Sequence, residues 1–161
     1  SRWCRCCGWC TSSDMGSRRA ARELALQALY QVDLLGDGQQ DARSLALFWE
    51  HFDPAADPEV REFARALVDG VREQRERIDA LIAGAAEHWR LPRLSRVDLS
   101  LLRLGTFELI GRPEIPASVT LNEAVEIARR FGSEESASFV NGVLDHVARQ
   151  VGAQGLSGAS E

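Results

Sequence analysis

Apolar residues recur every three or four positions along most of this chain, which is the pattern of helices that bury one face. The densest stretch begins near Ser95, and its apolar residues fall on nearly every side of the expected helix. They are Val97, Leu99, Leu101, Leu102, Leu104, Phe107, Leu109 and Ile110. We expect this helix to be central in the fold, because a helix that is apolar all round is buried on several sides. Ser95 and Asp98 have capping-box spacing at its start, and Gly111 with Pro113 ends it.

The same periodicity predicts six further helices and no convincing strand. They cover about residues 18–35 and 41–52, two stretches within 58–89, and residues 120–131 and 134–149. Asp57 is the expected N-cap before Pro58, which suits the first position of a helix. Thr120 and Glu123 have capping-box spacing at the start of their helix. The sequence therefore predicts an all-α fold of about seven helices.

The length of 161 residues suits one domain with a substantial core. We divide the chain into a Cys-rich leader (1–16), a helical domain (17–150) and a flexible Gly/Ser-rich tail (151–161). All four cysteines lie in the leader, namely Cys4, Cys6, Cys7 and Cys10. A structural zinc site usually needs a second ligand pair, and none follows nearby. We expect a disordered leader without metal, with Met15 as the natural start of translation.

The chain carries no pattern typical of an enzyme or of a membrane protein. It has no P-loop, GxGxxG, HExxH or GxSxG motif, and its three histidines (His51, His88 and His146) lie far apart. We therefore expect neither catalysis nor a cofactor. No stretch approaches the roughly 18 apolar residues of a membrane span, and no signal peptide is visible. These observations predict a cytoplasmic protein that does not bind membranes.

The first predicted helix carries a cluster of arginines, although the chain has a net charge of −5. On a helical wheel Arg19 and Tyr30 lie opposite the apolar face, Gln27 flanks them, and Arg18 and Arg22 lie at its borders. Arginines at a helix N-terminus oppose the helix dipole, which favours an anionic partner such as RNA phosphate. A solvated arginine face, with Tyr30 packed on its own helix, explains this pattern equally well.

A second candidate is Phe139, which lies on the far side of its helix from the predicted core stripe. Single-stranded RNA is commonly bound by stacking bases on aromatic side chains, so Phe139 and Tyr30 are candidate stacking platforms on one RNA face. Glu134 and Glu135 beside Phe139 would repel phosphate and limit the affinity. The alternative is that Phe139 fills a gap against the first helix.

Four motifs of this sequence resemble the NusB family of bacterial transcription antitermination factors. They are R-R-x-A-R-E-x-A-x-Q-A-L-Y at Arg18–Tyr30, D-x-x-L-L-R-L-x-x-x-E-L at Asp98–Leu109, I-P-x-x-V-x-L-N-E-A-V-E-I-A at Ile115–Ala128 and F-V-N-G-V-L-D at Phe139–Asp145. The resemblance spans about residues 17–149 and implies an all-helical fold of two packed bundles. It also implies binding to boxA-type single-stranded RNA together with NusE, a ribosomal small-subunit protein. Such a factor would support ribosomal RNA synthesis in the antitermination complex of RNA polymerase.

The resemblance, combined with the helical wheels, assigns two sets of residues. The RNA-binding set is Arg18, Arg19, Arg22, Gln27, Tyr30, Glu135 and Phe139, and the partner-binding set is Asp98, Ser118, Val119 and Leu121. Ala20 stands where the family often has a further basic residue, which weakens the arginine patch.

Two alternatives to a free-standing antitermination factor are considered. One is the helical RNA-binding domain that precedes some ribosomal RNA cytosine methyltransferases. The length of the chain argues against it, because no methyl-donor domain follows. The other is a homodimeric helical interaction protein without an RNA function. A homodimer that covers the RNA face is also compatible with the sequence.

Overall fold

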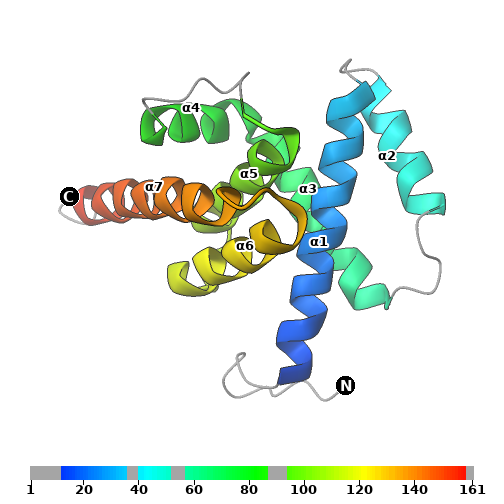
Figure 1. Ribbon diagram of the computed structural model, residues 1–161, viewed down its shortest axis with the longest axis horizontal. Helices are drawn as coiled ribbons and strands as arrows, with labels where there is room; N and C mark the ends of the chain where they lie inside the picture. Colours follow the sequence, from blue (N-terminus) through cyan, green and yellow to red (C-terminus); the bar gives the residue numbers. More distant parts are fainter. Residues whose placement is uncertain (1–11, 36–39, 52–56, 87–93, 159–161) are drawn as a thin grey trace.

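The computed structural model describes residues 12–35, 40–51, 57–86 and 94–158, and every regular element in these ranges is a helix (Figure 1). The seven helices are α1 (Ser12–Leu35), α2 (Gln40–His51), α3 (Pro58–Glu73), α4 (Arg75–Ala85), α5 (Arg96–Gly111), α6 (Ala117–Phe131) and α7 (Ser136–Gly158). Helices α1, α2 and α3 form one bundle, and α4, α5, α6 and α7 form the other. The all-α prediction with two packed bundles is confirmed.

Helix α5 is the central element, as its apolar pattern predicted. Every residue from Leu99 to Glu108 is buried, and the helix packs against α1, α3, α4, α6 and α7. The Ser95 half of the predicted capping box forms, in which the Ser95 hydroxyl accepts a hydrogen bond of 3.1 Å from the Asp98 backbone N–H. This cap satisfies one of the backbone donors left free in the first turn.

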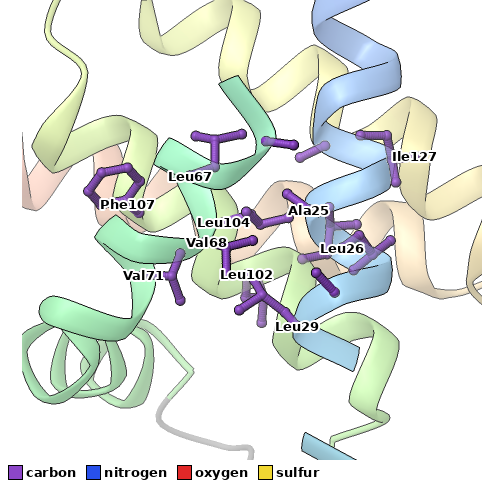
Figure 2. Close-up of a cluster of buried hydrophobic side chains, with 14 of the residues drawn as sticks. Ala25, Leu26, Leu29, Leu67, Val68, Val71, Leu102, Leu104, Phe107 and Ile127 are labelled. Atoms are coloured by element: carbon purple, nitrogen blue, oxygen red, sulfur yellow. The ribbon is translucent and has the colours of Figure 1, made fainter. Parts of the chain in front are cut away.

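The two bundles share one core, in which α1, α3 and α5 all pack against one another. Figure 2 shows Leu67, Val68 and Val71 of α3 beside Leu102, Leu104 and Phe107 of α5 and Ala25, Leu26 and Leu29 of α1. Gly70 allows this close packing of α3 on α5, because a Cβ there would overlap the Phe107 ring. The apolar contacts of Ala25, Leu26 and Leu29 hold α1 on the same core.

The start of α3 also follows its sequence signals. The Asp57 side chain accepts a hydrogen bond of 3.0 Å from the Glu59 backbone N–H, and Pro58 opens the helix. The two helical stretches predicted within residues 58–89 are divided at Gln74.

The ends of three helices differ from the prediction. Helix α1 begins at Ser12, so residues 12–16 of the expected leader are helical, while residues 1–11 and all four cysteines lie outside the described residues. Ser12, Ser13 and Asp14 are favourable residues for a helix start. Arg18 therefore lies beyond the first turn, where the helix dipole no longer acts, and the dipole argument for an anion partner is wrong.

The other two differences concern α7 and α6. Helix α7 extends to Gly158, so most of the expected tail is helical; the glycines of the tail each cost only about 1 kcal/mol relative to alanine. Helix α6 starts at Ala117 with Pro116 as its N-cap. Thr120 and Glu123 consequently lie inside the helix, and the capping box predicted for them is wrong. Among the described helices, none combines the length and apolar character needed to cross a membrane.

Candidate nucleic-acid interface

The three arginines of α1 fall on two sides of the helix, because four residues return to within about 40° of the same face whereas one residue turns by about 100°. Arg18 and Arg22 both lie by the Phe63 ring of α3, and Arg19 lies on the other side. Arg18 faces α3, with its guanidinium carbon 5.1 Å from the centroid of the Phe63 ring. Arg19 faces α6, and Arg22 points inward to α5. The expected continuous arginine patch is thus divided by the neighbouring helices.

Arg22 is a structural residue in the core. Its side chain is 7% exposed and forms an ion pair with Glu108 of α5, with the Nε donating to Oε1 at 2.6 Å. The Thr120 hydroxyl of α6 donates to the other oxygen of Glu108 at 2.8 Å. This network joins α1, α5 and α6, and a buried ion pair needs such additional hydrogen bonds to offset its desolvation. The prediction that Arg22 contacts RNA is therefore wrong, because no phosphate can reach it.

Arg19 forms a similar pair at the surface. Its Nε donates to Glu123 Oε2 at 2.7 Å and its Nη2 donates to Oε1 at 2.9 Å. The side chain of Arg19 is 40% exposed, whereas that of Glu123 is 6% exposed. The hydrogen bonds to Glu123 raise the pKa of the Arg19 guanidinium above its ordinary value. Arg19 is therefore a permanent, exposed cation whose orientation is fixed.

Farther along α1, an apolar groove opens between α1, α2, α5 and α6. We use the name apolar groove for the hollow of about 640 Å³ whose walls include Gln27, Tyr30, Leu34, Val97 and Phe131. Among the described residues, the exposed large apolar side chains are Tyr30, Leu34, Leu47 and Phe131. Three of the four line this groove, and Leu47 lines an adjoining hollow. The groove is the main exposed apolar surface of the described residues.

A second hollow lies beside the start of α7. This acidic hollow has a volume of about 580 Å³, and its walls include Asp98, Ser133, Glu134, Glu135 and Phe139. Phe139 is half-buried and packs against the core, so the prediction that it lies away from the core is wrong in part. Its neighbours in the hollow come from the start of α5 rather than from α1.

The first turn of α5 separates the two hollows. Val97 lines the apolar groove, and the next residue, Asp98, lines the acidic hollow. Tyr30 and Phe139 therefore occupy neighbouring hollows instead of one continuous site. Between the groove and Arg19, Arg130 of α6 pairs with Glu23 of α1 at 2.9 Å. The predicted RNA residues except Arg18, which faces α3, and Arg22, which is buried, thus follow the border of α1 with α6 and then the start of α7.

The structure does not bring the predicted partner-binding residues together. Asp98 lies in the first turn of α5, whereas Ser118, Val119 and Leu121 lie in the first turns of α6. Thr120 in that segment reaches Glu108, which is ten residues along α5 from Asp98. At 1.5 Å per residue these two parts of the set are about 15 Å apart along α5. An ordinary protein–protein interface of about 800 Å² per partner spans this distance, so the partner-binding set stays a prediction.

Glu123 and Phe131 belong to this surface but are missing from the predicted site. The spacing of Glu123 from Thr120 fits a capping box, whereas the partner of Glu123 is 104 residues away. Phe131 is predicted only as a helix end before Gly132. Its position in the last turn of α6, where few core neighbours remain, is the sequence signal that could have indicated exposure.

Comparisons with known proteins agree with this architecture. The NusB family model matches residues 19–149. The chain is 49% identical over 134 residues to the transcription antitermination protein NusB of Myxococcus xanthus, which covers 83% of this chain and 96% of that protein. It is 48% identical over 138 residues to the protein of the same name from Sorangium cellulosum, covering 86% of this chain and 96% of that protein.

Solved structures give the same result. The structure of T. maritima NusB matches with a TM-score of 0.72 and 40% sequence identity, over 82% of this chain and 90% of that one. A structure of the antitermination factors NusB and NusE in complex with dsRNA matches with a TM-score of 0.73 and 29% identity, over 84% of this chain and 98% of that one. Sequence and fold together establish that this chain belongs to the NusB family.

Proposed function

We propose that this protein is an RNA-binding transcription antitermination factor that binds boxA-type single-stranded RNA together with the ribosomal protein NusE. In this role it supports ribosomal RNA transcription within an antitermination complex of RNA polymerase. Relatives named as transcription antitermination proteins support the proposal, as does the relative solved with NusE and RNA. The observation in this chain that carries it is the surface from Arg19 to Phe139, which combines fixed cations with aromatic hollows.

The arginine end of this surface supplies the contacts to phosphate. Arg18 and Arg19 come from consecutive positions of α1 and remain partly exposed. Forked guanidinium groups suit phosphate oxygens, and such contacts add affinity with little choice of base. Gln27 and Tyr30 follow on the same helix, so the contacts on α1 extend about 16 Å from Arg19 to Tyr30.

The acidic hollow at the other end supplies a site for a base. Phe139 offers a stacking surface, and stacking is worth roughly 1–3 kcal/mol per base. Glu134 and Glu135 line the same hollow and repel phosphate, so the backbone of the RNA passes outside it while a base points inward. The hollow of about 580 Å³ has room for such a base.

The apolar groove is the surface for the protein partner. Exposed apolar patches rimmed by polar residues commonly mark protein interaction sites. Leu34 and Phe131 are 52% and 38% exposed, and neither contributes hydrogen-bonding groups from its side chain to RNA. Asp98 adjoins the groove through Val97 and belongs to the same proposed contact. Tyr30, in the wall of the groove, lies where the RNA and the partner would meet.

The RNA proposal is tested by fluorescence anisotropy with a labelled boxA oligonucleotide, with and without NusE. The expected result is binding of the single strand that NusE strengthens, and weaker binding of a scrambled strand and of the boxA duplex. Equal affinity for the boxA and scrambled strands, with or without NusE, would contradict the proposal. Preference for the duplex would contradict the single-stranded target.

The partner proposal is tested by pull-down of NusE with single variants. Leu34→Asp and Asp98→Asn are expected to weaken the capture of NusE, because they alter the groove and its border. Ser118→Asp tests the prediction that the first turn of α6 also contacts the partner. If Ser118→Asp abolishes capture while Leu34→Asp does not, the partner lies on α6. If Leu34→Asp instead dissolves a homodimer in light scattering without affecting NusE, a second copy covers the groove.

A further inference from the structure

We propose that Glu123 is a positioning residue for RNA binding, which holds the Arg19 guanidinium so that its remaining N–H groups face an RNA phosphate. This inference rests on the proposed RNA-binding function and deepens it. Glu123 itself contacts no RNA, because its side chain lies beneath Arg19 and is only 6% exposed. The role is therefore to orient another residue.

The hydrogen bonds show which edge of Arg19 is occupied. Glu123 accepts from Nε at 2.7 Å and from Nη2 at 2.9 Å, so both oxygens of the carboxylate engage one edge of the guanidinium. A guanidinium has five N–H donors, and this pairing leaves three of them available. The side chain of Arg19 is 40% exposed, so a large part of it is open to solvent although its pair with Glu123 is formed. A phosphate can approach this free edge without breaking the ion pair.

The part of α6 that carries Glu123 is joined to the core by a neighbouring network. Glu123 lies on α6 one turn after Thr120, whose hydroxyl donates to the buried Glu108 at 2.8 Å. Glu108 also accepts from Arg22 of α1 at 2.6 Å. The two pairs Arg19–Glu123 and Arg22–Glu108 thus join the same turns of α1 to α6 and α5. Because Glu123 is buried and its helix is joined to this network, Glu123 can define where the Arg19 guanidinium lies at the surface.

If Glu123 positions Arg19, its loss should lower the affinity for RNA. If Glu123 only repels phosphate, its loss should raise that affinity. A carboxylate near RNA repels phosphate, so removing its charge alone should tighten binding. Losing the support of Arg19 should weaken binding, because the freed side chain must be ordered again when RNA binds. Glu126 provides a matched control, because it lies three residues farther along α6, pairs with the exposed Arg129 at 2.6 Å and acts on Arg19 through its charge alone.

The test measures boxA RNA affinity for Glu123→Gln and Glu126→Gln, which remove the same charge from neighbouring positions. We expect Glu123→Gln to weaken binding by about threefold and Glu123→Ala by up to about tenfold, the effect of freeing one long side chain. Glu126→Gln should leave the affinity unchanged or raise it. Tightening by Glu123→Gln equal to that by Glu126→Gln would overturn the proposal. Urea unfolding of each variant identifies the folded fraction used in the titrations.

A double-mutant cycle with Arg19→Ala separates positioning from a general effect on the fold. In the Arg19→Ala background, Glu123→Gln should no longer weaken RNA binding, because no guanidinium remains to be held. The same weakening in both backgrounds would show a structural effect alone and would contradict the proposal. If the unaltered protein does not bind boxA RNA, or if Arg19→Ala has no effect, the proposed function fails at that step. If the unaltered protein binds boxA RNA and Arg19→Ala weakens that binding, but Glu123→Gln leaves the affinity unchanged, only the positioning role of Glu123 is contradicted.

Discussion

The inner and the outer side of α1 use the same chemical pair for different purposes. On the inner side Arg22 donates to Glu108 at 2.6 Å, and on the outer side Arg19 donates to Glu123 at 2.7 Å. The exposed fraction of the arginine side chain is 7% in the first pair and 40% in the second. The two arginines are three residues apart, yet only Arg19 has donors that an external anion can reach.

This difference shows that burial, rather than residue type, decides the role of a basic side chain. A buried ion pair is committed to the fold, because removing either partner leaves an uncompensated charge. Breaking a half-exposed ion pair lowers the free energy of unfolding only a little, because water replaces the missing partner. The arginine motif of α1 therefore combines a structural residue with candidate RNA contacts. Each of the following predictions tests one side of that distinction.

The largest expected effect is the loss of stability in Arg22→Ala. Removing one partner of a buried pair costs about 3–5 kcal/mol, so the free energy of unfolding should fall by that amount. Arg19→Ala should cost only about 1 kcal/mol, because truncating an exposed side chain lets water reach Glu123. Urea unfolding of the two variants measures both values. Equal losses would contradict the contrast between the two sides of α1.

A paired replacement sharpens this prediction. Arg22→Met combined with Glu108→Leu removes both charges and keeps apolar volume, and such replacements of buried pairs are often neutral or stabilising. We expect the double variant to be more stable than Arg22→Ala by at least about 2 kcal/mol. A double variant as unstable as the single one would show that the helices need the ion pair itself.

Phe139→Ala should have an intermediate effect that divides between folding and binding. Because Phe139 is half-buried against the core, its loss should cost about 2 kcal/mol, less than the roughly 3–5 kcal/mol of a fully buried Phe. RNA affinity should fall by about tenfold, because the stacking surface is removed. Urea midpoints and RNA titrations of the same variant measure the two effects. Unaltered affinity of the folded fraction would show that Phe139 is only a core residue.

The smallest expected effect is a tightening of RNA binding in Glu135→Gln. Glu135 is exposed in the acidic hollow, so its charge repels phosphate through water. Removing an exposed charge changes such an interaction by less than about 1 kcal/mol, which corresponds to about two- to fivefold in affinity. Anisotropy titrations at low salt detect a change of this size. Weaker binding would indicate that Glu135 accepts a hydrogen bond from a base.

The helices and their caps could be predicted because they depend on neighbours in the sequence. The caps at Asp57 and Ser95 each involve a backbone N–H only two or three residues away. The same local logic failed for Thr120 and Glu123, whose spacing fits a capping box but whose partners are Glu108 and Arg19. Spacing of three residues also places two side chains on one helical face, so it cannot distinguish a cap from contacts to other helices.

The site could be predicted only in part, for the same reason. A helical wheel shows which side of α1 a residue occupies, but it does not show which helix covers that side. Arg22 lies at a border of the apolar face, and its partner Glu108 is 86 residues away. Similarly, Phe139 lies opposite the main stripe of α7 but meets the start of α5 there. Packing of distant helices decided both outcomes.

The most direct test of this account is the salt dependence of RNA binding. Removing one phosphate contact should reduce the slope of log affinity against log salt by about 0.7 for a single strand. We predict that Arg18→Ala with Arg19→Ala lowers the slope by about 1.4, as expected when two phosphates are no longer neutralised. Arg22→Met with Glu108→Leu should leave the slope unchanged. An unchanged slope in the first variant, or a reduced slope in the second, would contradict the division of α1 into an RNA side and a structural side.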